Sequence, residues 1–391
     1  MASPFSPAEF EQRLARTRTR MAERGMDHLV VTDPANLYYL TGFDACSFYN
    51  PQALVVPADG PLAFFCREVD ATSAWQTSNL DESQVFGYPE RFVQKPDVHP
   101  MDWIAATLQD LLAGSAIVGV ENESPQYTIR AHDALVAGLG RGIAVRSTPS
   151  IVNWVRAVKT PAEIEVMRAA GRITERIFEA ATEAIRPGVR QSDAVAEIYA
   201  AQIRGLDDAG GAYAAIPPLV LAGVNTSYPH VPWSDTPFGE TEPIALELSG
   251  CRYRYHAPVA RTMFLGDPPT RLLDLAAVVG EGLDEALATM RAGAPCEDPA
   301  IAWDAVIARH GLTKESRIGY PVGIGYPPDW GEQTMSLRKG ERMPLEAGMT
   351  FHVMIGMWLD GWGYSVSETV LITDTGVDRL ASIPGGLLRP T

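Results

Sequence analysis

The sequence predicts two domains, an α/β domain over residues 1–150 and an α+β domain over residues 151–391. In the first, short apolar strands alternate with helices as far as residue 146, the pattern of an α/β domain with a central sheet. A polar, proline-containing segment at residues 147–150 then separates the domains. Beyond it, helices grouped in sequence accompany long strands, which predicts a curved antiparallel sheet covered by helices.

Local signals place the elements of the first domain. Ser6 caps a helix that has Pro7 in its first turn and that we expect to end at Gly25. A strand at His28–Thr32 is followed by a turn at Asp33–Pro34. The remaining predicted elements are a hairpin of residues 53–57 and 62–66, a strand at 117–121, and helices at 101–112 and 127–139.

In the second domain, Thr160 and Pro161 predict the start of a long helix that ends near Ile185. The other predicted helices cover residues 192–203, 272–290 and 299–310. The predicted strands cover residues 218–222, 244–248, 261–265, 350–358 and 364–373. We expect a turn at Ser249–Gly250 to join the second and third of these strands.

Composition excludes several classes of partner. The chain has 48 acidic and 32 Lys and Arg residues, a net charge of −16, which disfavours nucleic acid and anionic membranes as partners. The four cysteines form no CxxC pair and are expected to be reduced and mostly buried. With no signal peptide and no apolar run of membrane-spanning length, we expect a cytoplasmic protein.

One carboxylate stands out within the predicted sheet. Glu247 lies in the middle of the otherwise apolar strand at residues 244–248. Such a charge faces solvent, pairs with a partner, or is kept for chemistry. Glu247 is therefore the first candidate for a catalytic residue.

Four segments, in order along the chain, resemble the creatinase/aminopeptidase P ("pita-bread") family. They are an R-x-x-K…E-I-x-x-M-R pattern at residues 156–168, the strand pair from Glu247 to Thr262, an L-x-x-G-M-x-F turn at 345–351, and an E-x-T-V-L-like strand at 367–371. The resemblance covers nearly the whole chain. It implies a pita-bread fold for residues 151–391 and the family's smaller domain for residues 1–150.

The same resemblance implies that the family's metal centre is lost. Members that are metallopeptidases hold two ions with two Asp, one His and two Glu, the hard ligands that such ions require. The corresponding positions here are Glu247, Pro258, Tyr320, Met354 and Ser367. Only one of the five can act as such a ligand, so we expect no metal and no cofactor.

Among metal-free members, the chain is most similar to the ectoine hydrolases. The matching segments are residues 37–52, 99–103, 247–262, 316–334 and 345–352, of which the run Gly325–Glu332 is the most distinctive. This resemblance implies hydrolysis of a small cyclic amidine that also carries a carboxylate. Ser365 and Ile355 replace an acidic residue and a proline that ectoine hydrolases tend to have.

Residue roles follow from this resemblance and from side-chain chemistry. Glu247 pairs with the amidinium or attacks its carbon, and His230 acts as acid or base. Either Glu332 or Glu368 could activate water. The expected substrate-binding residues are Tyr320, Tyr326, Trp330, Trp358, Tyr255, Arg261, Phe48 and Asp44. The aromatic residues among them could equally be core residues.

The segment with Asp44 and Phe48 matches the part of the family's first domain that reaches a neighbouring subunit's active site, which implies a homodimer. Three alternatives to an ectoine hydrolase stay open. They are a creatinase-like amidinohydrolase acting on another C–N substrate, an inactive relative that only binds a ligand, and a metal-dependent Xaa-Pro peptidase.

Overall fold

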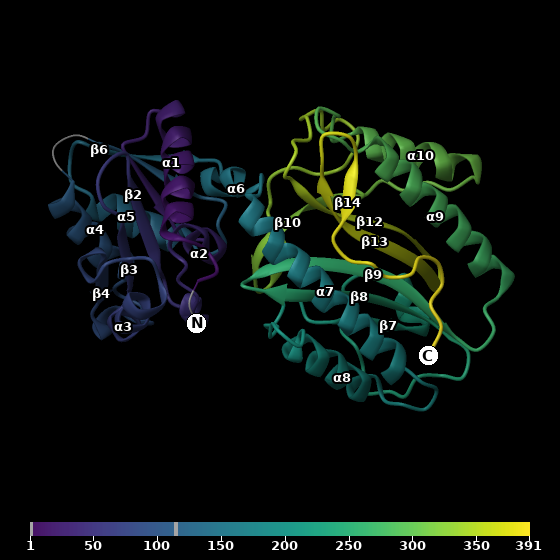
Figure 1. Cartoon of the computed structure of the whole chain (residues 1–391). Helices are drawn as coiled ribbons and strands as arrows, with labels where there is room; N and C mark the ends of the chain where they lie inside the picture. Colours follow the sequence, from purple (N-terminus) through teal and green to yellow (C-terminus); the bar gives the residue numbers. More distant parts are fainter. Residues whose placement is uncertain (1–2, 113–115) are drawn as a thin grey trace. The chain divides into compact units, whose positions relative to one another are not determined.

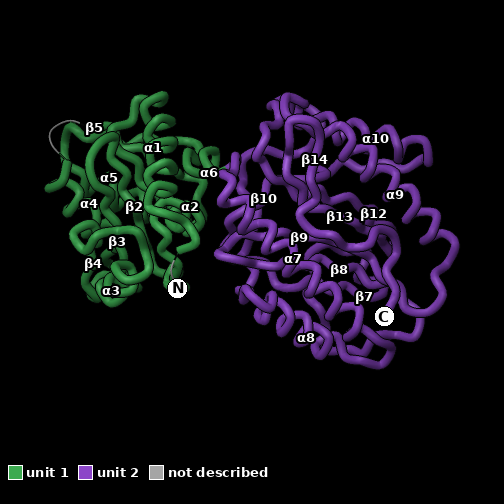
Figure 2. Tube along the Cα trace, viewed as in Figure 1, with its two compact units in different colours: residues 1–156 green, residues 157–391 purple. Residues whose placement is uncertain are grey.

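A computed structural model describes residues 3–112 and 116–391 of the chain. The chain divides into two compact units, Met1–Arg156 and Ala157–Thr391 (Figure 2). The division follows Arg156 rather than the predicted residue 150. Helix α6 (Ile151–Arg156) belongs to the first unit, where the Val152 N–H donates to the Glu121 carboxylate at 2.9 Å.

The first unit is an α/β domain, as predicted (Figure 1). Its sheet has the strand order β4-β3-β2-β1-β5-β6; β1 runs parallel to β5 and antiparallel to β2. Its elements are α1 (Pro7–Glu23), β1 (His28–Val31), α2 (Pro34–Thr41), β2 (Ala53–Pro57), β3 (Ala63–Arg67), α3 (Glu68–Thr77), β4 (Val85–Tyr88), α4 (Pro100–Leu111), β5 (Ala116–Glu121), α5 (Ile129–Gly138) and β6 (Ile143–Thr148).

The second unit is an antiparallel sheet covered by helices, which confirms the predicted class (Figure 1). The strand order is β14-β13-β12-β10-β9-β8-β7, with β11 paired to β10. The elements are α7 (Pro161–Ala184), α8 (Gln191–Arg204), β7 (Leu219–Ala222), β8 (Glu242–Arg252), β9 (Tyr255–Leu265), α9 (Thr270–Thr289), α10 (Asp298–Arg309), β10 (Gly319–Tyr326), β11 (Asp329–Gly331), β12 (Thr350–Leu359), β13 (Trp362–Ile372) and β14 (Val377–Arg379).

Helix α7 begins where the sequence predicts, because Thr160 and Glu163 cap each other's backbone N–H groups. The helix packs its apolar face, including Ile173 and Ile177, against β8 and β9. Helix α9 packs against β12 and β13, and α10 packs on α9. These contacts hold the strands that supply the candidate active site.

The predicted turn at Ser249–Gly250 is wrong. Both residues lie inside β8, and the turn to β9 is formed by Tyr253 and Arg254, whose φ angles are 46° and 65°. Gly250 stays in the strand because α7 approaches it closely, and its N–H donates to the Thr174 hydroxyl at 2.8 Å. The glycine therefore marks close backbone packing, not a turn.

Asp33 and Pro34 begin helix α2 rather than a turn. Asp33 caps the helix and accepts a hydrogen bond from the Asn36 N–H at 3.0 Å, and Pro34 occupies the first helical position. The same two residues suit a turn or a helix start. Burial of every residue from Pro34 to Thr41 favours the helix.

Replacing Gly250 by Ala is expected to lower the melting temperature strongly, with a loss of about 3 kcal/mol of unfolding free energy. The added Cβ would meet the Ala170 carbonyl oxygen and lie 2.7 Å from the Thr174 nitrogen, and backbone atoms of a packed helix cannot move aside easily. Gly280→Ala, in α9 with no atom within 4 Å of the added Cβ, is the control and should stabilise slightly. Equal melting temperatures for the two variants would contradict the close packing of α7 on β8.

None of the helices in the described part of the chain is long and apolar enough to cross a membrane. All four cysteines are free, as predicted; Cys66, Cys251 and Cys296 are buried, and Cys46 is exposed.

Candidate active site

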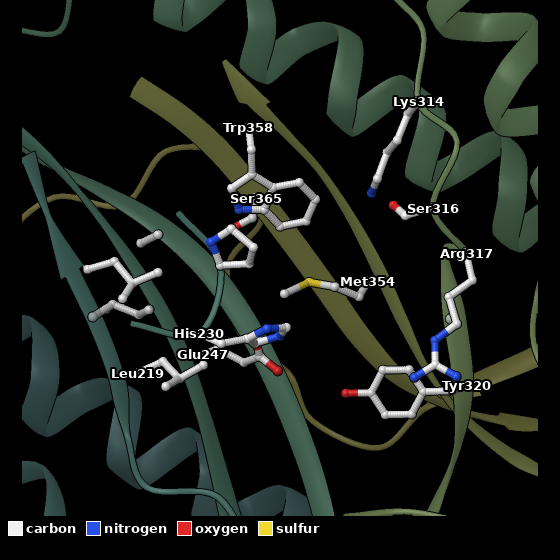
Figure 3. A pocket seen from close by; sticks show the side chains of 15 residues that line it. Leu219, His230, Glu247, Lys314, Ser316, Arg317, Tyr320, Met354, Trp358 and Ser365 are labelled. Carbon is white, nitrogen blue, oxygen red and sulfur yellow. The ribbon is translucent and has the colours of Figure 1, made fainter. Parts of the chain in front are cut away.

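A cavity of about 290 Å³ opens within the second unit, in the region where β7, β8, β10, β12 and β13 contribute side chains (Figure 3). Its size is at the lower end for ligand pockets, which suits a small molecule. One wall is apolar and comes from Leu219 and Leu221 of β7 and Ala245 and Leu246 of β8. The polar lining consists of His230, Glu247, Lys314, Ser316, Arg317, Tyr320 and Ser365.

Glu247 contributes the only carboxylate among the cavity's lining residues in the described part of the chain. Strand β8 carries it, paired with Leu219 of β7 and Ala260 of β9. It is half-buried and accepts no hydrogen bond from any residue that the structure describes. Because apolar surroundings disfavour the ionised form, burial raises the pKa of Glu247 to about 7. A carboxyl group with such a pKa, facing a cavity without a partner, is a candidate for chemistry.

Tyr320 of β10 points its hydroxyl group into the same cavity (Figure 3). Burial, and to a smaller extent the charge of Glu247, raise the pKa of Tyr320 well above its usual value. The phenol is therefore protonated and available as a hydrogen-bond donor. The Arg317 guanidinium stacks 4.6 Å from the centre of its ring and donates to the Ser336 hydroxyl at 3.1 Å.

Lys314 reaches the cavity from the loop between α10 and β10 (Figure 3). Its ammonium nitrogen lies 4.6 Å from the centre of the Trp358 ring, a cation–π contact. It forms no hydrogen bond or ion pair with the residues described here. Burial lowers the pKa of Lys314 to about 8, and the nearby Asp304 only partly offsets that shift. Lys314 is thus a half-buried cation available to an anionic ligand.

The structure brings together four of the residues that the sequence singles out. His230, Glu247, Tyr320 and Trp358 all line the cavity. His230 lies on the exposed loop after the 3₁₀ turn Gly223–Ser227 and has a φ of 65°, an uncommon conformation for a residue other than glycine. Such strain is frequent at functional sites.

The other two predicted acids do not line this cavity. Glu332 forms a fully buried ion pair with Lys159 at 2.6 Å, and Glu368 pairs with the buried Arg261 at 2.7 Å. Arg261 also donates to the carbonyl oxygens of Ala260, Ser367, Ile383 and Pro384. In this structure Glu332, Glu368 and Arg261 are engaged in holding the sheet together.

Three aromatic residues also lie outside the cavity lining. The Tyr255 hydroxyl donates to Glu163 at 2.7 Å and so supports the start of α7. Tyr326 packs under the Arg254 guanidinium, 4.9 Å from its ring centre. Trp330 is buried, and its Nε1–H donates to the Tyr320 hydroxyl at 3.1 Å. Trp330 therefore acts on the cavity through Tyr320.

Asp44 and Phe48 belong to the first unit. Asp44 is exposed, and Phe48 is half-buried in the 3₁₀ turn Cys46–Tyr49. Their proposed approach to an active site stays a prediction.

Sequence reasoning missed Lys314, Ser316, Arg317 and His352. Ser316 and Arg317 fall in the segment 316–334 that resembles the ectoine hydrolases, but no local signal distinguishes the lone Lys314. His352 lies within the apolar run of β12 and is fully buried. Its ring Nδ1 lies 3.0 Å from the Tyr320 hydroxyl, a contact set by the pairing of Tyr320 with His352 across β10 and β12.

The residues at the family's metal-binding positions do not fit a pair of metal ions. Met354 and Ser367 face each other across β12 and β13, and neither supplies a carboxylate. Pro258 pairs with Ser249 and offers no side-chain ligand. No three His, Cys, Asp or Glu side chains gather in a metal-binding arrangement within residues 3–112 and 116–391. Glu247 alone cannot replace the set of hard ligands that two ions require.

The helix-covered antiparallel sheet of the second unit, with the cavity among its strands, has the pita-bread fold. The model of metallopeptidase family M24 matches residues 165–374, and that of the creatinase/prolidase N-terminal domain matches residues 13–158. The chain belongs to this family of two-domain creatinase-like proteins.

Individual relatives cover nearly the whole chain. It is 40% identical over 388 residues to the ectoine hydrolase of Halomonas elongata, covering 97% of both. It is 41% identical over 385 residues to an uncharacterized hydrolase/peptidase of Sinorhizobium fredii, covering 98% of both. Among solved structures, the prolidase of Thermococcus sibiricus superposes with a TM-score of 0.83 at 19% identity, covering 97% of this chain and 99% of that one, a likeness of fold.

Proposed function

We propose that this protein hydrolyses a C–N bond of a small cyclic amidine, ectoine or a close analogue, without a metal ion. The observation that carries the proposal is the presence of two opposite charges in one small cavity. The Glu247 carboxylate and the Lys314 ammonium group both line it, and neither forms a hydrogen bond or ion pair with a residue that the structure describes. Ectoine carries an amidinium and a carboxylate. Its two charges match these two side chains.

Glu247 supplies the anion next to the amidine. Hydrolysis forms a C–O bond at the amidine carbon and breaks one C–N bond; the water oxygen becomes the acetyl oxygen, and both water protons end on the released amine. Glu247 either removes a proton from the attacking water or attacks the carbon itself to give a covalent intermediate. Its raised pKa, about 7, suits proton transfer near neutral pH.

Lys314 supplies the cation for the substrate carboxylate. Its ammonium group is already held against the Trp358 ring, 4.6 Å from the ring centre, so little ordering is needed on binding. The Trp358 ring also offers a flat apolar face to the substrate ring. His230, at the exposed rim, is the remaining acid or base candidate.

Ser365 is the reason for including close analogues of ectoine in the proposal. Ser365 lines the cavity where ectoine hydrolases tend to carry an acid, so the accepted cation can differ from that of the Halomonas elongata enzyme.

Asp44 and Phe48 are proposed to complete the site from a neighbouring subunit of a homodimer.

The test is turnover of ectoine by the purified protein with and without EDTA, followed by NMR of the N-acetyl-diaminobutyrate product. We expect the rate to be unchanged by the chelator, because the cavity lacks the ligands for a metal pair. Chelator-sensitive turnover restored by Mn²⁺ or Co²⁺ would contradict metal independence. Turnover of creatine but not ectoine would favour an amidinohydrolase, and calorimetric binding of ectoine without product would favour an inactive relative.

A further inference from the structure

A chain of four side chains leads from the cavity into the sheet. The Trp330 Nε1–H donates to the Tyr320 hydroxyl at 3.1 Å, and His352 Nδ1 lies 3.0 Å from the same oxygen. On the far side of the imidazole ring, His352 Nε2 lies 2.6 Å from the Ser367 hydroxyl. That hydroxyl also accepts a hydrogen bond from the Ala260 N–H at 2.6 Å. Each contact falls within hydrogen-bond distance.

The imidazole in this chain is neutral. His352 and Ser367 are both 0% exposed, and burial lowers the pKa of His352 to about 3. A neutral imidazole has one N–H donor and one acceptor nitrogen, so only two arrangements are possible. They differ in which nitrogen carries the hydrogen.

In the first arrangement, Nε2–H donates to Ser367. The serine oxygen then accepts from both Nε2 and the Ala260 N–H, and its own proton has no acceptor among the residues described. A buried hydroxyl group without an acceptor costs about 1–3 kcal/mol. The first arrangement is therefore disfavoured.

In the second arrangement, the Ser367 hydroxyl donates to Nε2 and Nδ1–H donates to Tyr320. The Tyr320 oxygen then accepts from both His352 and Trp330. Its own proton has no inward acceptor left, and the side facing the cavity is the direction open to it (Figure 3). Every polar group of these four side chains then has a hydrogen-bond partner or faces the cavity.

We propose that His352 carries its proton on Nδ1 and, together with Ser367 and Trp330, fixes Tyr320 as a hydrogen-bond donor directed at the bound substrate. His352 and Ser367 are positioning residues, because they act through Tyr320. The role of Tyr320 in the reaction rests on the proposed amidine hydrolysis. The tautomer of His352 does not depend on it.

The Tyr320 hydroxyl group can donate a hydrogen bond to a substrate nitrogen after oxygen has added to the amidine carbon, but not before. In an amidinium both nitrogens carry N–H and neither accepts a hydrogen bond. When oxygen adds to the carbon, the C=N electron pair moves onto one nitrogen, which becomes an acceptor and then leaves with a proton. A donor fixed in advance at that nitrogen stabilises the later state alone, so it raises kcat and changes KM little.

The first test reads the tautomer directly in the wild-type protein. We expect ¹⁵N-histidine NMR to show His352 protonated on Nδ1 and unprotonated on Nε2, assigned by loss of the signal in a His352 variant. Neutron diffraction from a crystal of the unmodified chain gives the same answer without any variant. A hydrogen on Nε2 would overturn the inference, whatever the substrate proves to be.

The second test uses a matched pair of variants. The amide nitrogen of Asn mimics Nδ1 and that of Gln mimics Nε2, so His352→Asn keeps the donor to Tyr320 and His352→Gln loses it. We expect His352→Gln and Tyr320→Phe each to lower kcat about 10- to 100-fold with KM nearly unchanged, and His352→Asn to stay within about 5-fold of wild type.

The double variant Tyr320→Phe/His352→Gln separates positioning from general support of the fold. If His352 acts through Tyr320, the double variant is no slower than Tyr320→Phe alone. Multiplying losses, or equal losses in the Asn and Gln variants, would overturn the positioning role. Absence of amidine turnover in the wild-type protein would instead contradict the proposed function and leave the tautomer measurement to decide this inference.

Discussion

Glu247→Gln is expected to lower the turnover of ectoine by about 1,000-fold or more while the protein stays folded. Gln has the same shape but can neither accept a proton from water nor attack carbon as a carboxylate. No other carboxylate in the described part of the chain lines the cavity to replace it. Product formation followed by NMR checks the rate, and circular dichroism checks the fold.

One control variant accompanies Glu247→Gln. Glu240→Gln removes an exposed acid that does not line the cavity and should leave the rate unchanged. Turnover of Glu247→Gln within about 10-fold of wild type would contradict any chemical role for this carboxylate. Calorimetry with ectoine then tells whether the variant still binds the ligand.

The difference in stability between the wild-type protein and Glu247→Gln should change with pH in a defined direction. The pKa of Glu247 is about 7 in the folded protein and 4.5 for a free glutamate, so folding favours the protonated form. Its stabilising contribution is full below about pH 4.5 and is lost as pH rises through about 7. As pH rises from about 4.5 to about 7, the melting temperature of the wild-type protein should therefore fall relative to that of Glu247→Gln.

Lys314→Met is expected to raise KM about 10- to 100-fold with a smaller change in kcat, because it removes the cation that pairs with the substrate carboxylate. The pKa of Lys314, about 8, predicts that wild-type KM also rises above that pH as the ammonium loses its proton. This alkaline rise should be absent in the variant. Steady-state kinetics between pH 6 and about pH 9.5 measures both effects.

Stability distinguishes a binding role of Lys314 from a structural one. The pKa of Lys314 is lowered from 10.5 to about 8 in the folded protein, so its cost to folding grows as pH falls from about 10.5 to about 8 and is complete below that. Lys314→Met should then melt at a higher temperature than wild type at pH 7, while binding more weakly. Lys95→Met, which removes an exposed lysine of the first unit that does not line the cavity, is the control and should leave KM unchanged. A lower melting temperature with unchanged KM would contradict the binding role.

The parts of the fold that the sequence predicts depend on local signals. The mutual capping of Thr160 and Glu163 specifies the start of α7 without any knowledge of the rest of the chain. Strand β10 has no such signal, since its three glycines and one proline argue against a strand. Those glycines are explained by tertiary packing, because a Cβ on Gly325 would lie 2.6 Å from Trp330 Cα.

Local signals in the sequence likewise identify some residues of the candidate site and miss others. Glu247 is recognisable because a charge in an apolar strand is unusual. Glu332 and Glu368 are indistinguishable from catalytic acids in the sequence, and only the buried cations Lys159 and Arg261 reveal their pairing. Lys314 and His352 gain their roles from Trp358 and Ser367, which neighbouring strands bring to them. Such contacts depend on which residues the folded sheet brings together, and an isolated lysine or histidine in the sequence does not reveal them.

The pairing of Met354 with Ser367 across β12 and β13 has an evolutionary consequence. A glutamate at position 354, which lines the cavity, would put a second carboxylate into the space that already holds Glu247. A glutamate at position 367 would displace the hydroxyl that contacts His352 and the Ala260 N–H. Several substitutions would have to occur together to build a two-metal site here, and each would be harmful by itself, so single substitutions cannot lead from the present cavity to such a site.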